Sequence, residues 1–293
     1  MESSTTELFN TLKPLGAVLN PDLVQATYAV MTPHCARLDP ALCRAAYDLS
    51  YAEHPRHLLD IYMPTTHETP QAVIVYVHGG GFAGGDKGGR DKPFFANIGA
   101  WATGAGLAAV SMSYRLVPEA RWPSGAEDVA QAVAWLSANA DEHLGGARKI
   151  ILAGQSAGAI NVADYLAGRA GAVNPHVVGA ILISGVYDFT RHERLPFEAA
   201  YFGSDTSRRG DQSTLEALIN LDLPLLFTVS ELDPPPFHQQ AAHIVEANVR
   251  NKGVWPRMHY LAEHNHVSPA LHIGADGDRL GPMLMVFIKG LLG

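Results

Sequence analysis

The sequence has few of the features that mark membrane-spanning, disulfide-stabilised or nucleic-acid-binding proteins. Only two of its 293 residues are cysteines, and a chain this long buries enough core to fold without a disulfide. We therefore expect Cys35 and Cys43 to be reduced. No apolar run reaches the roughly 18 residues that a membrane-spanning helix needs. The 21 Lys and Arg residues face 29 Asp and Glu residues without forming a basic cluster, which argues against nucleic acid and anionic membrane as partners.

The first ten residues, MESSTTELFN, lack the basic stretch and apolar run of an export signal, so a cytoplasmic location is expected. The composition is 47% hydrophobic and 17% charged, which is typical of a well-packed globular protein. The sequence is compatible with a homodimer but does not specify an oligomeric state.

Apolar runs alternate with amphipathic segments from residue 57 onward. The expected strands include residues 72–78, 106–115, 149–154, 177–184, 223–230 and 257–262. The expected helices lie near residues 91–104, 127–146, 157–170 and 236–251 and after Arg279. This order predicts an α/β fold with a mostly parallel sheet of about eight strands, whose ligands bind at the carboxyl ends of the strands.

Two segments do not follow this alternation. Residues 1–50 are predicted to form an amino-terminal helical cap segment before the main domain, residues 51–293. The region of about 186–221 is longer and more polar than an ordinary loop of such a sheet, so we interpret it as a cap insertion over the sheet edge.

The stretch ILAGQSAGAI places Ser156 between an expected strand and an expected helix. In Gly154-x-Ser156-x-Gly158, the two glycines suit a sharp strand-to-helix turn, because a Cβ at either position would meet neighbouring backbone. The amino terminus of the following helix favours a developing negative charge. Small residues can also serve packing alone, but the context favours Ser156 as a nucleophile.

A serine hydroxyl needs a base to accept its proton and an acid to orient that base. Asp233 follows one expected strand and His266 follows the next, so both belong to the same sheet edge as Ser156. Glu231 and Asp188 are alternative acids, and His264 is the alternative base. The other histidines near the end of the chain, His259 and His272, are interpreted with His264 as solvated surface residues, one of which could support the site.

The glycine-rich segment HGGGFAGGDKGG, residues 78–89, directly follows an expected strand. Successive glycines allow backbone amides to turn toward one point, as the oxyanion of acyl transfer requires. The segment lacks the spacing of either common phosphate-binding glycine loop, although a purely structural role remains open.

These motifs together resemble the α/β-hydrolase fold, and within it the hormone-sensitive-lipase-like carboxylesterases that carry an HGGG motif. HGGGF, GQSAG, the Asp233 loop and the His266 loop occur in the family's order, and YRLVPEARWPSGAEDV at 114–129 is also similar. The resemblance implies that amides of Gly80, Gly81 and Ala157 form the oxyanion hole, while His78 holds its loop in shape.

The sequence departs from that family beside the nucleophile, where Gln155 replaces the usual aspartate of GDSAG. HPRHLLDIYMP and SGVYDF are more similar to arylformamidases and small esterases of the same fold. Phe82, Gln155 and Tyr187 are the expected substrate contacts. One or two further aromatic residues from the insertion are expected to line the pocket. The wider set of aromatic candidates is Trp101, Phe189, Phe197, Tyr201 and Phe202.

The favoured function is therefore hydrolysis of small, short-acyl carboxylic esters by Ser156, His266 and Asp233 through an acyl-enzyme. Hydrolysis of a formamide or another amide is the alternative, and an inactive ligand-binding hydrolase fold is a third hypothesis. HNH at 264–266 and DGD at 276–278 contain potential metal ligands, but their spacing favours no metal site. No organic cofactor is implied.

Overall fold

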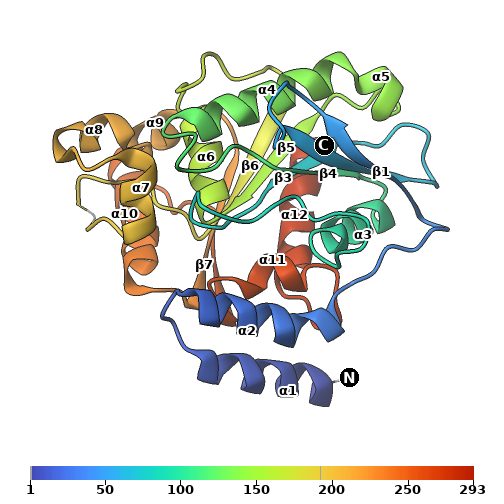
Figure 1. Cartoon of the computed structure of the whole chain (residues 1–293), viewed down its shortest axis with the longest axis horizontal. Helices are drawn as coiled ribbons and strands as arrows, with labels where there is room; N and C mark the ends of the chain where they lie inside the picture. Colours follow the sequence, from blue (N-terminus) through green and yellow to red (C-terminus); the bar gives the residue numbers. More distant parts are fainter. Residues whose placement is uncertain (1, 192) are drawn as a thin grey trace.

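The centre of the molecule is a single eight-stranded sheet with helices on both faces (Figure 1). The computed structural model describes residues 2–191 and 193–293. The strand order is β1-β2-β4-β3-β5-β6-β7-β8, in which β2 runs antiparallel to both β1 and β4 and the remaining neighbours are parallel. The strands are β1 (Cys43–Ser50), β2 (Leu58–Pro64), β3 (Val73–Val77), β4 (Ala108–Met112), β5 (Ile150–Gln155), β6 (Val177–Ile183), β7 (Leu225–Leu232) and β8 (Met258–Asn265).

Helices connect the parallel strands and also precede and follow the sheet. The α-helices are α1 (Glu2–Leu12), α2 (Pro21–Met31), α3 (Ala96–Gly104), α4 (Ser124–Ala138), α5 (Ala140–His143), α6 (Ala157–Leu166), α7 (Pro196–Phe202), α8 (Arg209–Gln212), α9 (Leu215–Asn220), α10 (Pro235–Lys252), α11 (Ser268–His272) and α12 (Leu280–Leu292). Short 3-10 helices are η1 (Lys13–Leu15), η2 (Thr32–His34) and η3 (Thr206–Arg208).

Strand β3 shows how the sheet divides the core into two layers. Its side chains alternate in direction, as in any strand, so Val75 joins one apolar cluster and Ile74 the other. The Val75 side of the sheet packs against α4 and α6, and the Ile74 side packs against α3 and α12. Because β3 is buried on both faces, it consists of apolar and aromatic residues without a polar alternation.

The predicted mostly parallel sheet of about eight strands is confirmed. The difference lies in residues 43–50, which are predicted to belong to the amino-terminal helical segment but form β1 at the sheet edge. Most β1 side chains after Cys43 are exposed or half-exposed, so the strand carries a weak apolar signal. Its position depends on main-chain pairing with β2.

Helices α1 and α2 lie together at one end of the molecule, next to α11, while α7 to α9 gather beside α10 (Figure 1). Leu8 and Phe9 of α1 are buried in the core layer on the Ile74 side. In the described parts of the chain, no helix combines the length and apolarity needed to cross a membrane.

Candidate active site

Ser156 lies at a sharp turn between β5 and α6. Its backbone has φ 54° and ψ −120°, a left-handed φ that few non-glycine residues adopt. The Ser156 amide donates to the carbonyl of Ile183 at 2.9 Å, which ties the turn to the neighbouring strand β6. The strained turn presents the hydroxyl above the carboxyl edge of the sheet, at the start of α6.

The two glycines around Ser156 are required by close backbone approach. A Cβ on Gly154 would lie 2.4 Å from the carbonyl oxygen of Gly158, and one on Gly158 would lie 2.1 Å from that of Val77. Both distances are far below van der Waals contact, and the atoms concerned are backbone. The tight packing that Gly154 and Gly158 permit brings the turn against the end of β3.

Ser156, His266 and Asp233 form a continuous chain of hydrogen bonds. The distance from Ser156 Oγ to His266 Nε2 is 2.8 Å, and that from His266 Nδ1 to Asp233 Oδ1 is 2.6 Å. All three side chains are at least 94% buried. With a carboxylate at Nδ1, the neutral imidazole keeps its proton on that nitrogen, which leaves Nε2 free to accept one from the serine.

Further donors hold the Asp233 carboxylate in place. Oδ2 accepts hydrogen bonds from the Ser184 hydroxyl and from the Ser230 amide, both at 2.7 Å. Because its negative charge is buried, these donors and His266 replace the water that it would otherwise bind. Ser184 lies at the end of β6 and was not singled out in the sequence, since a lone serine after a strand carries no distinguishing signal.

The alternative acids lie in other networks. Glu231 Oε2 accepts the amide of Glu263 at 2.7 Å, and Asp188 binds the amide of Thr190 and the guanidinium of Arg191, both at 2.9 Å. Of the three carboxylates considered, Asp233 is the one that the structure brings to His266.

His264, the alternative base, points to a different environment. Its Nδ1 lies 2.8 Å from the Ser268 hydroxyl, and its ring packs edge-on against Phe9 of α1. His272 contacts the same Phe9 ring. The interpretation of His264 and His272 as solvated surface residues is wrong, because neither is exposed. The amino-terminal helix that covers them is far away in the sequence.

The glycine loop borders Ser156 directly. A Cβ on Gly79 would lie 3.3 Å from the Ser156 Cβ, and Gly80 and Gly81 have left-handed φ values of 126° and 60°. Within the described part of the chain, the amides of Gly80 and Gly81 donate no hydrogen bond. His78 supports the loop: its ring stacks on Tyr114, whose hydroxyl donates to the His78 carbonyl at 2.9 Å.

The expected substrate contacts separate into different environments. Phe82 is fully buried and stacks on Tyr201 of α7, with ring centroids 3.9 Å apart, in an apolar cluster that also contains Ala157. Tyr187 instead packs in the core layer on the Val75 side, edge-on to Phe227. The Gln155 amide is directed to the main-chain carbonyls of His266 and Val267.

The wider aromatic candidates divide in the same way. Phe189, Tyr201 and Phe202 join the Phe82 cluster. Trp101 lies near Gly274 and Gly281, beside a different surface pocket. The side chain of Phe197 lies outside the described residues.

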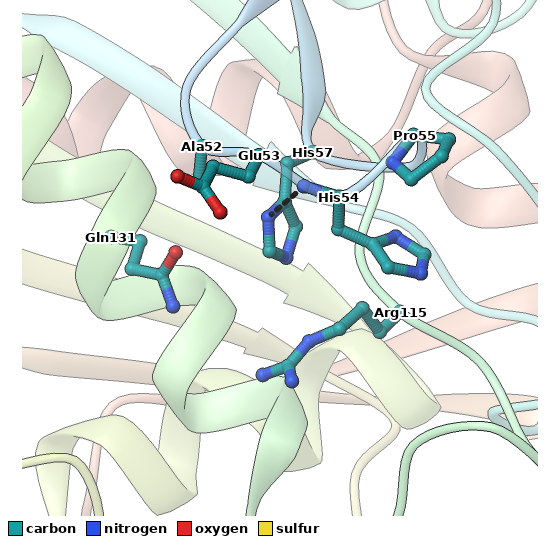
Figure 2. Close-up of a pocket in the computed structure, with 7 residues that line it drawn as sticks. All are labelled: Ala52, Glu53, His54, Pro55, His57, Arg115 and Gln131. Carbon is teal, nitrogen blue, oxygen red and sulfur yellow. Dashed lines mark hydrogen bonds between the residues drawn. The ribbon is translucent and has the colours of Figure 1, made fainter.

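An open pocket of about 610 Å³ lies beside the loop at residues 52–57 (Figure 2). Two of its lining side chains share one acid, since His57 Nε2 lies 3.1 Å from Asp128 and Arg115 also binds Asp128. None of the residues at the Ser156 site lines it. The pocket is lined by Ala52, Glu53, His54, Pro55, His57, Arg115 and Gln131.

The described residues contain no group of three or more His, Cys, Asp or Glu side chains placed to hold a metal ion. Asp278 of the DGD segment uses its carboxylate to accept the amides of Gly274, Leu280 and Gly281 at 2.7–2.9 Å. Cys35 and Cys43 are separate buried thiols, as expected.

Buried histidines predict a loss of stability in mild acid. Burial lowers the pKa of His264 to about 3 and of His78 and His272 to about 4, below the ordinary value near 6.5. At these three positions the unfolded chain therefore binds protons from pH 6.5 downward, while the folded chain does not until pH 3–4. Their contribution to stability is fully present above pH 6.5 and is lost as the pH falls through this interval.

We expect Tm to fall by on the order of 10 °C between pH 6.5 and 4, because one pKa unit corresponds to about 1.4 kcal/mol. Thermal unfolding followed by circular dichroism measures this slope. His264→Asn, which still offers Ser268 an acceptor, should reduce it, whereas the same exchange at the exposed His67 should not. An equal slope in His264→Asn and wild type would contradict this explanation.

The fold defines the protein's structural class. An esterase of the bacterial hormone-sensitive lipase family has a solved structure that matches with a TM-score of 0.70, over 98% of both chains, at 18% sequence identity. Together with the eight-stranded sheet and its flanking helices, this similarity establishes the α/β-hydrolase fold. The fold expected from the sequence resemblance is confirmed.

Sequence comparison adds relatives that are esterases by name. The BD-FAE family model matches residues 59–173. Esterase LipC of Mycobacterium tuberculosis is 34% identical over 112 residues, which are 37% of this chain and 26% of LipC. Acetyl esterase of Salmonella paratyphi A is 30% identical over 189 residues, 57% of this chain and 56% of that protein. The chain thus spans between about a quarter and just over half of the length of these relatives.

Proposed function

We propose that this protein is a serine carboxylic-ester hydrolase that cleaves small, short-acyl esters through an acyl-enzyme. The observation that carries the proposal is the hydrogen-bonded chain of Ser156, His266 and Asp233 beside the unpaired amides of the glycine loop. The similarity to named esterases supports an ester as the substrate. The side chains supply a nucleophile, a base and an acid without a cofactor.

In the proposed reaction, Ser156 Oγ attacks the ester carbonyl carbon while His266 Nε2 accepts the hydroxyl proton. The amides of Gly80, Gly81 and Ala157 bind the oxyanion of the tetrahedral intermediate. The C–O bond to the alcohol then breaks, and His266 returns the proton to the leaving oxygen. Water, deprotonated by the same histidine, then attacks the acyl carbon. The bond from this carbon to Ser156 Oγ breaks, His266 returns its proton to Oγ, and the carboxylic acid leaves.

Two segments are proposed to form the cap over this site. The first is the pair α1 and α2, and the second is the insertion at residues 186–221, which contains α7 to α9. Leu19 from the loop before α2 and Tyr201 from α7 both pack in the apolar cluster of Phe82 and Ala157. Two parts of the chain that are distant in sequence thus meet around one side of the nucleophile turn.

The stacked rings of Phe82 and Tyr201 support the preference for short acyl groups. Both are at most 1% exposed, so they already fill the apolar space beside Ala157. A long acyl chain on this side would have to displace them. We expect kcat/KM for p-nitrophenyl butyrate to exceed that for p-nitrophenyl decanoate by at least tenfold.

Release of p-nitrophenol measures this ratio in the wild-type protein. An equal or higher rate on the decanoate would contradict the short-acyl preference. The same comparison should include N-formylkynurenine as a substrate. If the protein turns over this formamide faster than every ester, its function is amide hydrolysis rather than ester hydrolysis.

A further inference from the structure

We propose that Gln155 is a positioning residue that fixes the loop carrying His266 relative to the nucleophile turn. This inference rests on the proposed function, because it concerns the same Ser156 and His266. Gln155 ends β5, directly before Ser156, and is 5% exposed. Its Nε2 donates to the main-chain carbonyl of His266 at 2.7 Å and lies 3.3 Å from that of Val267.

The orientation of the Gln155 amide follows from its partners. Main-chain carbonyls only accept hydrogen bonds, so the group that faces His266 and Val267 must be the NH₂. The amide oxygen, Oε1, accepts from the Tyr76 hydroxyl at 3.1 Å. Tyr76 lies on β3, is 1% exposed and packs against the ring of Phe95. The amide is therefore held at both ends, by a rigid strand and by the His266 loop.

A second amide holds the His266 loop from the side of the amino-terminal helices. Asn265 Oδ1 accepts the amides of Val267 and Ser268, both at 3.0 Å, and its Nδ2 donates to Thr27 of α2 at 2.8 Å. Gln155 completes this support from the sheet. Because its bond is to the carbonyl of His266 itself, it restrains the backbone from which the imidazole projects.

The side chain at this position decides whether such a bond can form. The family pattern that the sequence resembles has aspartate here, whose ionised carboxylate only accepts hydrogen bonds and is one methylene shorter. It could not donate to the two carbonyls of the loop. Gln155 is thus a feature of this chain that links Ser156 and His266 through a neutral donor.

Gln155→Met keeps the length of the side chain and removes its hydrogen bonds to the His266 loop and to Tyr76. We expect kcat on p-nitrophenyl butyrate to fall about 10- to 100-fold, since a displacement of about 1 Å in a catalytic group costs rates of this order. KM should change by less than about threefold, because the Gln155 amide bonds to the His266 loop and to Tyr76. Labelling of Ser156 by a fluorophosphonate should slow in parallel.

Gln155→Glu changes the shape of the side chain less and tests the donor itself. A buried glutamic acid has a raised pKa, so it can donate its proton to the His266 carbonyl in mild acid but repels that carbonyl once ionised. We expect the ratio of Gln155→Glu to wild-type kcat to fall as the pH rises from about 5.5 to 8.5. A purely structural role predicts a constant ratio.

Asn248→Leu is the matched control, because this mostly buried asparagine on α10 donates to the carbonyl of Val254 at 2.7 Å, away from the Ser156 site. It should lower Tm without lowering kcat. The proposal is overturned if Gln155→Met keeps wild-type kcat and labelling, if Asn248→Leu loses as much kcat, or if the Gln155→Glu ratio is independent of pH. If Gln155→Met does not fold, the Gln155→Glu ratio decides alone.

The proposed function can fail separately. If the wild-type protein cleaves no ester, ester hydrolysis is wrong, and the labelling rates of Ser156 in Gln155→Met and Gln155→Glu still test the positioning of His266. Conversely, the wild-type protein could cleave esters while the Gln155 variants keep its kcat and labelling rate. That result would support the proposed function and refute only the positioning role of Gln155.

Discussion

Ser156→Ala is expected to lower kcat/KM for p-nitrophenyl butyrate by about 10⁴- to 10⁶-fold. Alanine removes the oxygen that would form the acyl-enzyme, while the amides of the glycine loop and the rest of the pocket remain. The residual rate is therefore expected to lie above that of the uncatalysed reaction. Tm should stay within about 3 °C of the wild-type value, because the lost hydroxyl makes one short bond to His266.

Non-additivity provides a sharper version of this test. If Ser156 and His266 act in one step, the double variant Ser156→Ala, His266→Ala should be no slower than Ser156→Ala alone. Initial rates and thermal unfolding of the three proteins measure both effects. A further loss of two or more orders of magnitude in the double variant would show that the two residues act independently, contrary to the proposed mechanism.

Asp233→Asn is the change with the second-largest expected effect, a decrease in kcat of about 10³- to 10⁴-fold. The asparagine NH₂ can donate to His266 Nδ1, which favours the tautomer with its proton on Nε2. That tautomer cannot accept the Ser156 proton. The geometry changes little, since Ser184 and the Ser230 amide still have an oxygen to bind, so KM should change by less than about threefold.

Asp188→Asn is the control for Asp233→Asn, because Asp188 bonds to Thr190 and Arg191 and not to His266. Its expected effect on kcat is threefold or less. Steady-state kinetics on p-nitrophenyl butyrate compare the two variants. Retention of more than a tenth of wild-type kcat in Asp233→Asn would show that the acid does not set the histidine tautomer.

The sequence predicts the sheet well because its central strands are buried on both faces. Strands β3, β5 and β6 consist of nearly continuous apolar runs. At the sheet edge, β3 is followed by His78 and three glycines, and β5 and β6 are each followed by a serine. The predicted elements therefore appear close to their expected bounds. Strand β1 is not predictable in this way. It is an edge strand with mostly exposed side chains, and its position depends on pairing with β2 rather than on apolar content.

The candidate site is predictable where chemistry and position in the chain coincide. Ser156, Asp233 and His266 each follow a strand, and parallel strands bring their carboxyl ends together, so the convergence follows from the topology. Contacts between distant segments are not predictable in this way. Burial of His264 depends on Phe9 of α1, which lies 255 residues earlier in the chain. The sequence around His264 contains no pattern that predicts this burial.

Gln155 and Tyr187 show the same limit for side-chain direction. Gln155 precedes the nucleophile in the sequence and Tyr187 is an aromatic residue of the insertion, so both are expected substrate contacts. Gln155 reaches the carbonyl of His266, 111 residues away, and Tyr187 turns into the core against Phe227. Their directions depend on the packing of neighbouring strands and loops, which the sequence pattern around each residue does not contain.

The most direct test of the central claim is covalent labelling of the full-length protein by a p-nitrophenyl alkylphosphonate, followed by intact-mass measurement and peptide mapping. We predict one phosphonyl group per chain, located on Ser156, with release of one p-nitrophenol and loss of ester hydrolysis in proportion. The His266→Ala variant should label at least 100-fold more slowly. Two results would contradict a nucleophilic Ser156. One is unchanged ester hydrolysis by phosphonate-treated protein that carries no adduct, and the other is an adduct on another residue that abolishes activity.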